Sequence, residues 1–106
     1  MKTVYVYQID NLSGSTVDLM KVDMPEFPGI KWLVTRIMTP IKHRNEGYAT
    51  NVLQMVLKDA DKEGETLILS VSPEEPNIDI NRLIEFYERY EFVYQSNDIM
   101  TRNPSG

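Results

Sequence analysis

Ile37-Met38-Thr39-Pro40-Ile41-Lys42-His43-Arg44-Asn45-Glu46-Gly47-Tyr48-Ala49-Thr50 is the stretch that organises this chain. A strand-like segment, residues 31–39, stops at Pro40, and a short basic loop leads into a helical pattern that opens at Gly47. The first N–H groups of a helix have no intrahelical partner, and the helix dipole adds partial positive charge there. A strand, a glycine-containing turn and a helix N-terminus in this order are typical of a phosphate-binding loop.

The loop does not match the two commonest phosphate motifs. No Gly-Lys-Ser/Thr follows the glycine, as a Walker A loop requires, and three spaced glycines are absent. The run 44–49 has the form Arg/Gln-x-x-Gly-x-Gly/Ala. It resembles the acetyl-CoA loop of the GCN5-related N-acetyltransferases, the GNAT family. Taken alone, the same six residues also fit a solvated turn between a strand and a helix.

Composition bounds the other possibilities. A chain of 106 residues forms one domain, residues 1–106, and 42% hydrophobic residues supply a core. Zero cysteines and one histidine argue against a metal site. The net charge of −5 argues against nucleic-acid binding and favours cationic partners such as amines. No run is long and apolar enough for a membrane span and the start lacks a signal-peptide pattern, so we expect a cytoplasmic protein.

Three strands are predicted before the loop, at 3–9, 16–24 and 31–39, with a turn at 11–15 between the first two. They are expected to form an antiparallel meander. The nearly continuous apolar run Trp32-Leu33-Val34 indicates a central strand that is buried on both faces.

A helix, a strand, a second helix and a hairpin are predicted after the loop. The first helix has an apolar stripe at helical spacing and ends at Gly64. The following strand, 65–72, is expected to lie parallel to 31–39 with the helix as crossover. Asp79 is the expected N-cap of the second helix, and segments 92–95 and 99–102 form a closing hairpin. The inner stripe of the second helix comprises Ile80, Leu83, Ile84 and Tyr87.

A second motif joins the loop motif. The run 83–92, Leu-Ile-Glu-Phe-Tyr-Glu-Arg-Tyr-Glu-Phe, resembles the GNAT pattern Leu/Phe-Tyr-Glu-Lys/Arg-x-Gly-Phe of the last helix. Together the two motifs identify residues 30–103 as similar to a short GNAT protein that lacks the two front helices. The resemblance implies an α/β (α+β) fold, with an antiparallel meander followed by a βαβ unit whose parallel strands splay.

Three positions depart from the family pattern. Ile41 stands where a proline is common, with Pro40 before it. Glu91 replaces a turn glycine, so the turn is expected to need another conformation. Ile80 stands where an asparagine often contacts CoA, with Asn81 beside it.

The resemblance implies that acetyl-CoA lies in the notch between strands 31–39 and 66–72. Backbone groups of Ile37 and Thr39 would pair with the pantetheine arm, and the Thr50 hydroxyl and Arg44 would assist the pyrophosphate. The three basic residues 42–44 would make the local field positive. The backbone amides expected to hold the pyrophosphate are those of Asn45, Glu46, Gly47, Tyr48, Ala49 and Thr50.

The resemblance also implies the chemistry: direct attack of a primary amine on the thioester in a ternary complex. A backbone N–H near Met38 would stabilise the developing oxyanion, and Tyr87 would protonate the departing thiolate. A phenol with a pKa near 10 keeps its proton at neutral pH, although a core tyrosine is the other interpretation. His43 is expected to be a surface loop residue. The base is left open among Glu74, Glu75 and Asp79, each of which also fits a loop charge or a cap.

The acceptor is not readable from the sequence. Without front helices, the site is either an open groove for a small amine, a protein lysine or an N-terminus, or a site completed by a second subunit in a homodimer. The alternative function is a non-catalytic GNAT-fold module that binds CoA or a protein partner.

Overall fold

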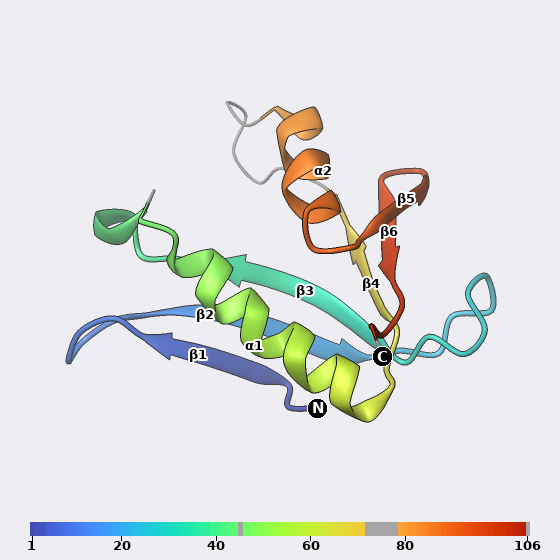
Figure 1. The fold of residues 1–106 in the computed structure, drawn as a ribbon, viewed down its shortest axis with the longest axis horizontal. Coiled ribbons are helices and arrows are strands. Elements are labelled where there is room, and N and C mark those ends of the chain that lie inside the picture. Colours follow the sequence, from blue (N-terminus) through green and yellow to red (C-terminus); the bar gives the residue numbers. More distant parts are fainter. Residues whose placement is uncertain (45, 72–78, 106) are drawn as a thin grey trace.

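The computed structural model of the protein describes residues 1–44, 46–71 and 79–105. A six-stranded mixed sheet carries two α-helices and a short 3₁₀ helix (Figure 1). The strand order is β1-β2-β3-β4-β6-β5, which agrees with the predicted fold class. The elements are β1 (Val4–Gln8), β2 (Gly14–Lys21), β3 (Trp32–Met38), η1 (Ile41–His43), α1 (Tyr48–Glu63), β4 (Leu67–Ser70), α2 (Ile80–Glu88), β5 (Val93–Ser96) and β6 (Ile99–Arg102).

The first three strands form the predicted antiparallel meander, but β2 lies earlier in the chain than expected. The Asp10 carboxylate accepts hydrogen bonds from the amides of Leu12 and Ser13, at 2.7 and 2.9 Å, and so closes the turn before Gly14. Gly14 therefore begins the strand, opposite Gln8. A Cβ at Gly14 would lie 2.9 Å from the Tyr7 carbonyl oxygen, which explains the glycine.

A β-bulge in β3 sets the shape of the sheet. Asp18 pairs with Arg36 and Leu19 with Val34, so Thr35 is an extra residue. Bulges bend the strand that carries them. The parallel pairing of β3 with β4 runs only as far as Val34 and Leu69, and the last residues of β3 pair with β2 alone. The predicted splay between the two parallel strands therefore begins at the bulge.

The two helices lie over different parts of the sheet and share one core. Helix α1 contacts β1, β2 and β3, whereas α2 contacts β5. Gly64 ends α1 in a left-handed conformation with φ 69°, and Asp79 caps α2 by accepting from the Asn81 amide at 2.9 Å, as predicted. The apolar side of α2 packs against the core that α1 buries.

Only one face of the sheet is covered by helices in the described parts of the chain. Trp32 and Val34 are buried beneath α1, but Leu33 between them is only half-buried. The prediction that this strand is buried on both faces is therefore wrong. No helix of the described residues lies on the second face, where several apolar side chains are exposed: Val4, Val6, Met20, Met38 and Val93.

The turn between α2 and β5 contains the glutamate that stands in place of the family pattern's glycine. Glu91 has φ 72°, a left-handed conformation that glycine adopts without strain and other residues rarely adopt. Whether this conformation differs from that of the family turn, as expected, stays a prediction. Strands β5 and β6 form the predicted hairpin, and Asn97 and Asp98 also adopt positive φ at its tip.

Candidate active site

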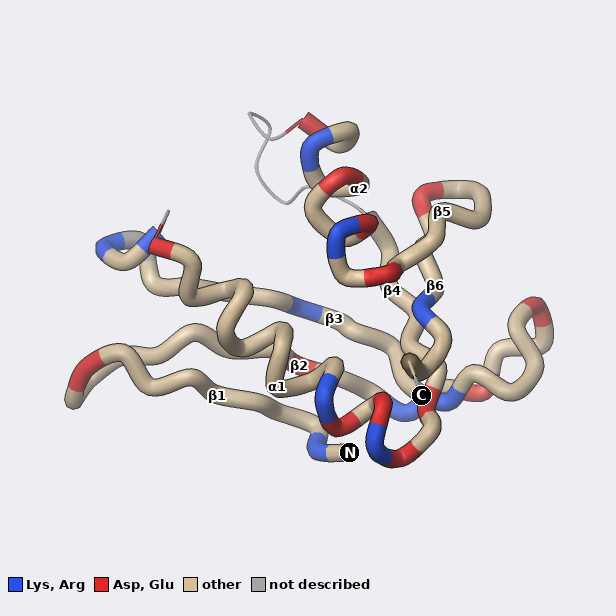
Figure 2. Tube along the Cα trace, in the orientation of Figure 1, with Lys and Arg blue, Asp and Glu red and all other residues tan. Residues whose placement is uncertain are grey.

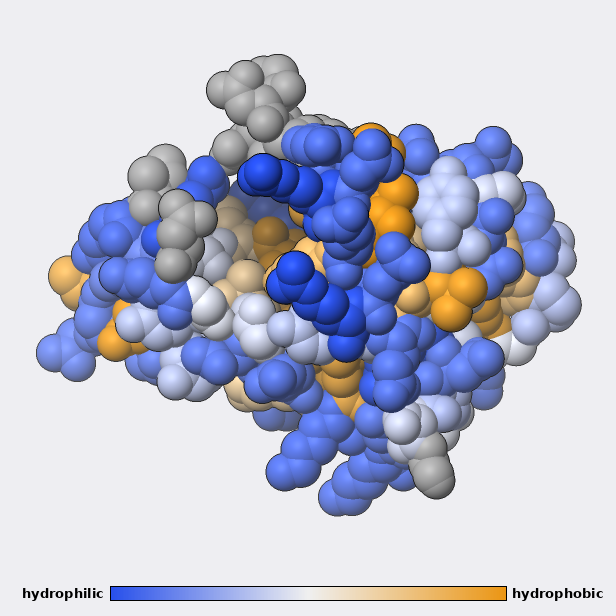
Figure 3. Space-filling view, turned by 45° about the horizontal axis from the view of Figure 1, so that its top comes forward, coloured by the Kyte–Doolittle hydropathy of each residue, from blue (hydrophilic) through white to orange (hydrophobic). Residues whose placement is uncertain are grey.

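The gap between the two helices lies over the place where β3 leaves β4. A space-filling view shows a hollow with an apolar floor between the first turns of α1 and α2 (Figure 3). The lysine and arginine positions of η1 and α2 lie on the two sides of this gap (Figure 2). We call this hollow the notch. The structure therefore brings the predicted loop, the end of β3 and the second motif to one place.

Helix α1 begins without the usual cap. Gly47 is its N-cap residue with φ 81°, no side chain caps the first turn, and no acidic residue lies in it. A Cβ at Gly47 would meet no atom within 4 Å, so the space beside the helix end is open. Uncapped amides with open space in front of them are suited to an external anion. The described amides 46–50 thus fit a pyrophosphate, while Asn45 lies outside the described residues.

The basic loop is more neutral than predicted. Lys42 Nζ lies 3.6 Å from the Asp10 carboxylate, and His43 lies between Asp10, at 3.0 Å, and Glu46, at 3.4 Å. His43 lies in a surface loop, as predicted, and its side chain is 20% exposed because it packs between the two carboxylates. Hydrogen bonds from Leu12, Ser13 and His43 hold the pKa of Asp10 well below its usual range. Two of the loop's three basic side chains therefore face carboxylates.

The end of β3 is held by a buried serine that the sequence analysis did not single out. Ser15 is fully buried, and its hydroxyl donates to the Met38 carbonyl at 3.1 Å and contacts the Thr39 hydroxyl at 2.8 Å. The N–H and C=O of one residue leave an extended strand on the same side. The Met38 amide therefore faces β2, and the amide of its neighbour Ile37 is directed to the open edge of β3. At this edge the Ile37 amide is the donor beside Met38 that a ligand could meet, and the oxyanion role predicted for an N–H near Met38 stays a prediction.

Tyr87 lies at the base of α2 with a buried ring and an accessible hydroxyl. Its ring packs edge-on against Phe86 and Phe92, at centroid distances of 5.2 and 5.6 Å. The Tyr87 hydroxyl forms no hydrogen bond with a described residue. Every buried side-chain oxygen or nitrogen among the described residues has a hydrogen-bond partner, so this hydroxyl is not one of the buried atoms. The oxygen is therefore accessible to solvent. Burial of the ring raises the pKa of Tyr87 to about 12, so the phenol keeps its proton at neutral pH.

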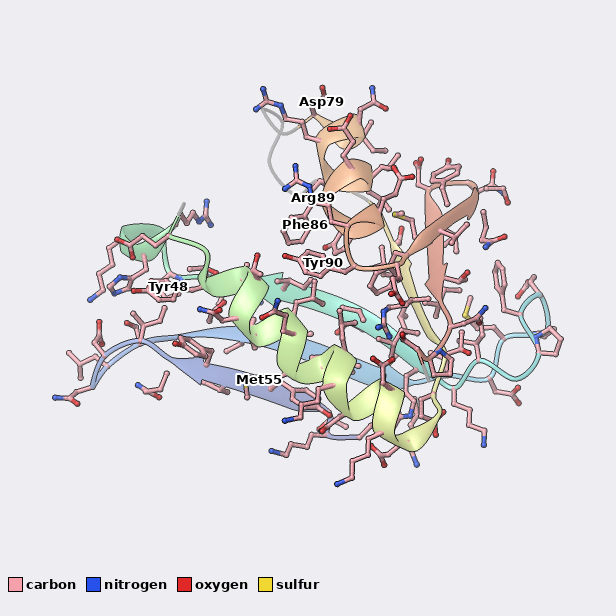
Figure 4. The ribbon with its side chains drawn as sticks, in the orientation of Figure 1. Tyr48, Met55, Asp79, Phe86, Arg89 and Tyr90 are labelled. Carbon is pink, nitrogen blue, oxygen red and sulfur yellow. The ribbon has the colours of Figure 1, made fainter. Side chains whose placement is uncertain are left out.

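Tyr90 is a contact that motif matching missed. Its hydroxyl donates to the Thr50 hydroxyl at 3.2 Å, and this bond joins the end of α2 to the first turn of α1. Tyr90, Phe86 and Arg89 point from α2 toward the side of the gap where α1 begins (Figure 4). Since Thr50 accepts from Tyr90, its own proton is free to be donated to an anion. The sequence signal for this contact was the spacing of Phe86 and Tyr90, which lie one helical turn apart.

The candidate bases have different positions. Asp79 caps α2, which fits the cap interpretation, and Glu74 and Glu75 lie outside the described residues. Ile80, at the position of the family's asparagine, packs against the core, while Asn81 is exposed. Within the described ranges no three His, Cys, Asp or Glu side chains are grouped to hold a metal ion, and no helix there is long and apolar enough to cross a membrane.

A separate cavity of about 400 Å³ lies at the opposite end of β3 and β4. It is lined by the loop 26–30 and by polar side chains of Thr66, Gln95, Thr101 and Asn103. It contains none of the predicted site residues. The candidate site is therefore the notch, where the helix end and the splayed strand meet.

This arrangement is the fold of the GNAT acetyltransferases, because solved structures of that class superpose on the chain. An acetyltransferase assigned to the GNAT family from Desulfovibrio desulfuricans has a TM-score of 0.58 and 15% identity, over 90% of this chain and 62% of its own. A protein described as histone acetyltransferase HPA2 and related acetyltransferase, from Corynebacterium glutamicum, has a TM-score of 0.60 and 19% identity, over 87% of this chain and 58% of its own.

A third structure matches this chain along nearly its whole length. The anti-CRISPR protein AcrVA5 has a TM-score of 0.63 and 15% identity, over 94% of this chain and 98% of its own. The chain otherwise spans about three-fifths of the matched acetyltransferases. The same fold occurs in the AtaT toxin bound to an antitoxin segment and acetyl-CoA, with a TM-score of 0.51 and 12% identity. No protein-family model matches the chain, and no curated protein sequence does.

Proposed function

We propose that this protein transfers the acetyl group of acetyl-CoA to a primary amine. The observation that carries the proposal is the uncapped N-terminus of α1, which opens beside Gly47 directly above the splay of β3 from β4. An anionic, extended thioester such as acetyl-CoA matches both features. Its pyrophosphate meets the amides of the first turn, and its arm meets the unpaired edge of β3 at Ile37 and Thr39.

Two groups of the chain would carry the chemistry, and a base would accept the proton of the amine. The Ile37 amide donates to the oxygen that becomes negative as the amine nitrogen bonds to the carbonyl carbon. The Tyr87 hydroxyl gives its proton to the sulfur as the carbon–sulfur bond breaks. The amine loses its own proton to water or a carboxylate, and Asp79 remains a candidate for that role. When bound, acetyl-CoA supplies the activated acetyl group.

The acceptor is proposed to be an amine on a macromolecule. The sheet face opposite α1 carries no helix in the described parts of the chain, so nothing there encloses a small molecule. An open groove admits a protruding lysine or N-terminus, but it encloses too little of a small metabolite to hold it. A site completed by a second copy of the chain is the other arrangement, and measurement of the oligomeric state with and without acetyl-CoA separates the two.

The alternative function is a module that binds CoA without catalysis. The feature that favours it is the high pKa of Tyr87, about 12, because a general acid works best with a pKa near the working pH. Incubation with acetyl-CoA and a panel of amines and lysine peptides decides between the functions. Amine-dependent release of free thiol supports the transferase, whereas CoA binding without release supports the module.

The anion site is tested by substitution of Gly47. Gly47→Asp places a negative charge beside the helix end, and Gly47→Asn adds nearly the same bulk without charge. Both residues tolerate left-handed backbone, so the fold is expected to survive. We expect the aspartate to weaken CoA binding tenfold or more relative to the asparagine, by calorimetry. Equal affinities of the two variants and the wild type would remove this loop from the site.

A further inference from the structure

The notch side of α2 carries two arginines with no acidic partner among the described residues. Arg82 and Arg89 are both exposed, and no carboxylate within the described ranges forms an ion pair with either. Glu85, one turn before Arg89, does not reach it within ion-pair distance. This differs from the loop across the notch, where Asp10 and Glu46 face Lys42 and His43. In a protein of net charge −5, two exposed arginines that pair with no carboxylate of the described residues favour an anionic ligand.

Phe86 lies between the two arginines on the same side of α2. Residues 82, 86 and 89 follow the i, i+4, i+7 spacing of one helix face. Arg89 and Phe86 point toward the beginning of α1 (Figure 4). The Phe86 ring contacts the Tyr90 ring at 5.3 Å, and Tyr90 donates to Thr50 in the first turn of α1. The arginine-bearing face is thereby fixed opposite the helix end that we assign to the pyrophosphate.

The chemistry of this face matches the nucleotide end of CoA. That end carries a phosphate monoester on the ribose 3′ oxygen and an adenine ring. Guanidinium groups bind phosphate oxygens in a bidentate manner, and aromatic rings and guanidinium planes stack on bases. Seven residues of helix span roughly 10 Å, which is comparable to the length of an adenosine phosphate.

We infer that Arg82, Phe86 and Arg89 bind the 3′-phosphoadenosine end of CoA, so that the protein selects CoA over dephospho-CoA. The inference rests on the proposed function, because it assumes that the pyrophosphate lies at α1. The two arginines bind the 3′-phosphate, and Phe86 stacks on the adenine. The residues of α2 would thus determine which form of the cofactor is used, and they take no part in the acetyl transfer.

The test compares CoA with dephospho-CoA by calorimetry. Wild-type protein is expected to bind CoA roughly tenfold or more tightly than dephospho-CoA, the size of one charge-assisted phosphate contact. The double variant Arg82→Gln/Arg89→Gln should bind the two ligands with equal affinity. That affinity should equal the affinity of the wild type for dephospho-CoA. Phe86→Leu should weaken both ligands and keep their ratio.

The matched control is Lys58→Gln/Lys62→Gln, which removes the same charge from exposed positions toward the other end of α1. This variant should keep the wild-type preference. Equal binding of the two ligands by the wild type, or an unchanged preference in the arginine double variant, would overturn the inference while the proposed function stands. If the wild type bound neither ligand, the proposed function would fail and the inference with it.

Discussion

At the scale of single residues, Tyr87 links the fold to the chemistry. Its ring packs against the core, as the structural interpretation predicts, while the general-acid role remains our proposal. In Tyr87→Phe we expect kcat to fall by roughly 10²–10⁴-fold, because the thiolate would leave without its proton donor. CoA affinity should change little, since the lost hydroxyl is not assigned to the cofactor.

The matched control for that experiment is Tyr94→Phe, which removes a hydroxyl that bonds Asp98 in the hairpin β5–β6. It should leave kcat unchanged. A Tyr87→Phe enzyme with normal kcat and a lower melting temperature would return Tyr87 to a purely structural role.

Glu91 is a second residue whose backbone can be tested. Left-handed backbone costs a non-glycine residue about 1–2 kcal/mol, and Glu91 has φ 72°. Its carboxylate lies 3.8 Å from Arg102 but is 61% exposed, so this contact contributes little. Glu91→Gly should therefore stabilise the protein by about 0.5–1 kcal/mol in urea denaturation, because the entropy that glycine loses on folding offsets part of the relieved strain. Glu91→Ala, which loses the carboxylate and keeps the strain, should show no such gain.

At the scale of elements, α1 is tied to β6 by an ion pair between the buried Arg102 and the partly exposed Asp61. Arg102 is 4% exposed, and its guanidinium donates to both oxygens of Asp61, at 2.8 and 3.1 Å, and to the Tyr90 carbonyl at 2.8 Å. Asp61→Asn leaves a buried guanidinium without its carboxylate. We expect a loss of about 2–3 kcal/mol in unfolding free energy at pH 7.

The pH dependence of Asp61→Asn gives an independent check. The Arg102 hydrogen bond lowers the pKa of Asp61, so its contribution is present above the unfolded pKa near 4. It is lost as pH falls through the lower, folded pKa. The difference between wild type and Asp61→Asn should therefore shrink below about pH 4. Asp23→Asn, at an exposed position, should show no difference at any pH. If the difference in unfolding free energy between wild type and Asp61→Asn stayed constant with pH, ionisation of this carboxylate would be excluded as the source of the stabilisation.

The elements themselves followed from the sequence because their signals are local. Gly64 ends α1 and Asp79 caps α2 through backbone and side-chain chemistry within a few residues. The splay was expected only from the family resemblance, since its cause, the bulge at Thr35, depends on register between strands. The Asp10–His43 and Tyr90–Thr50 contacts join residues 33 and 40 positions apart, so no local pattern could indicate them.

At the scale of the whole molecule, charge and coverage are unevenly distributed. The chain carries −5 overall, yet basic residues of η1 and α2 lie around the notch (Figure 2). The remaining surface is therefore more acidic than the average. An approaching cationic partner would meet this acidic surface before it reaches the notch.

This distribution predicts how salt affects the reaction. If the acceptor is a cationic amine, the acidic surface raises its rate of encounter, and salt screens that attraction over a Debye length of about 10 Å at 0.1 M. We expect kcat/KM for the acceptor to fall several-fold between 50 and 300 mM KCl, while kcat at saturation stays nearly constant. The control is a peptide acceptor with glutamates beside its lysine, for which the salt dependence should weaken or reverse. A flat profile for both peptides would show that the acceptor is recognised through neutral or apolar contacts.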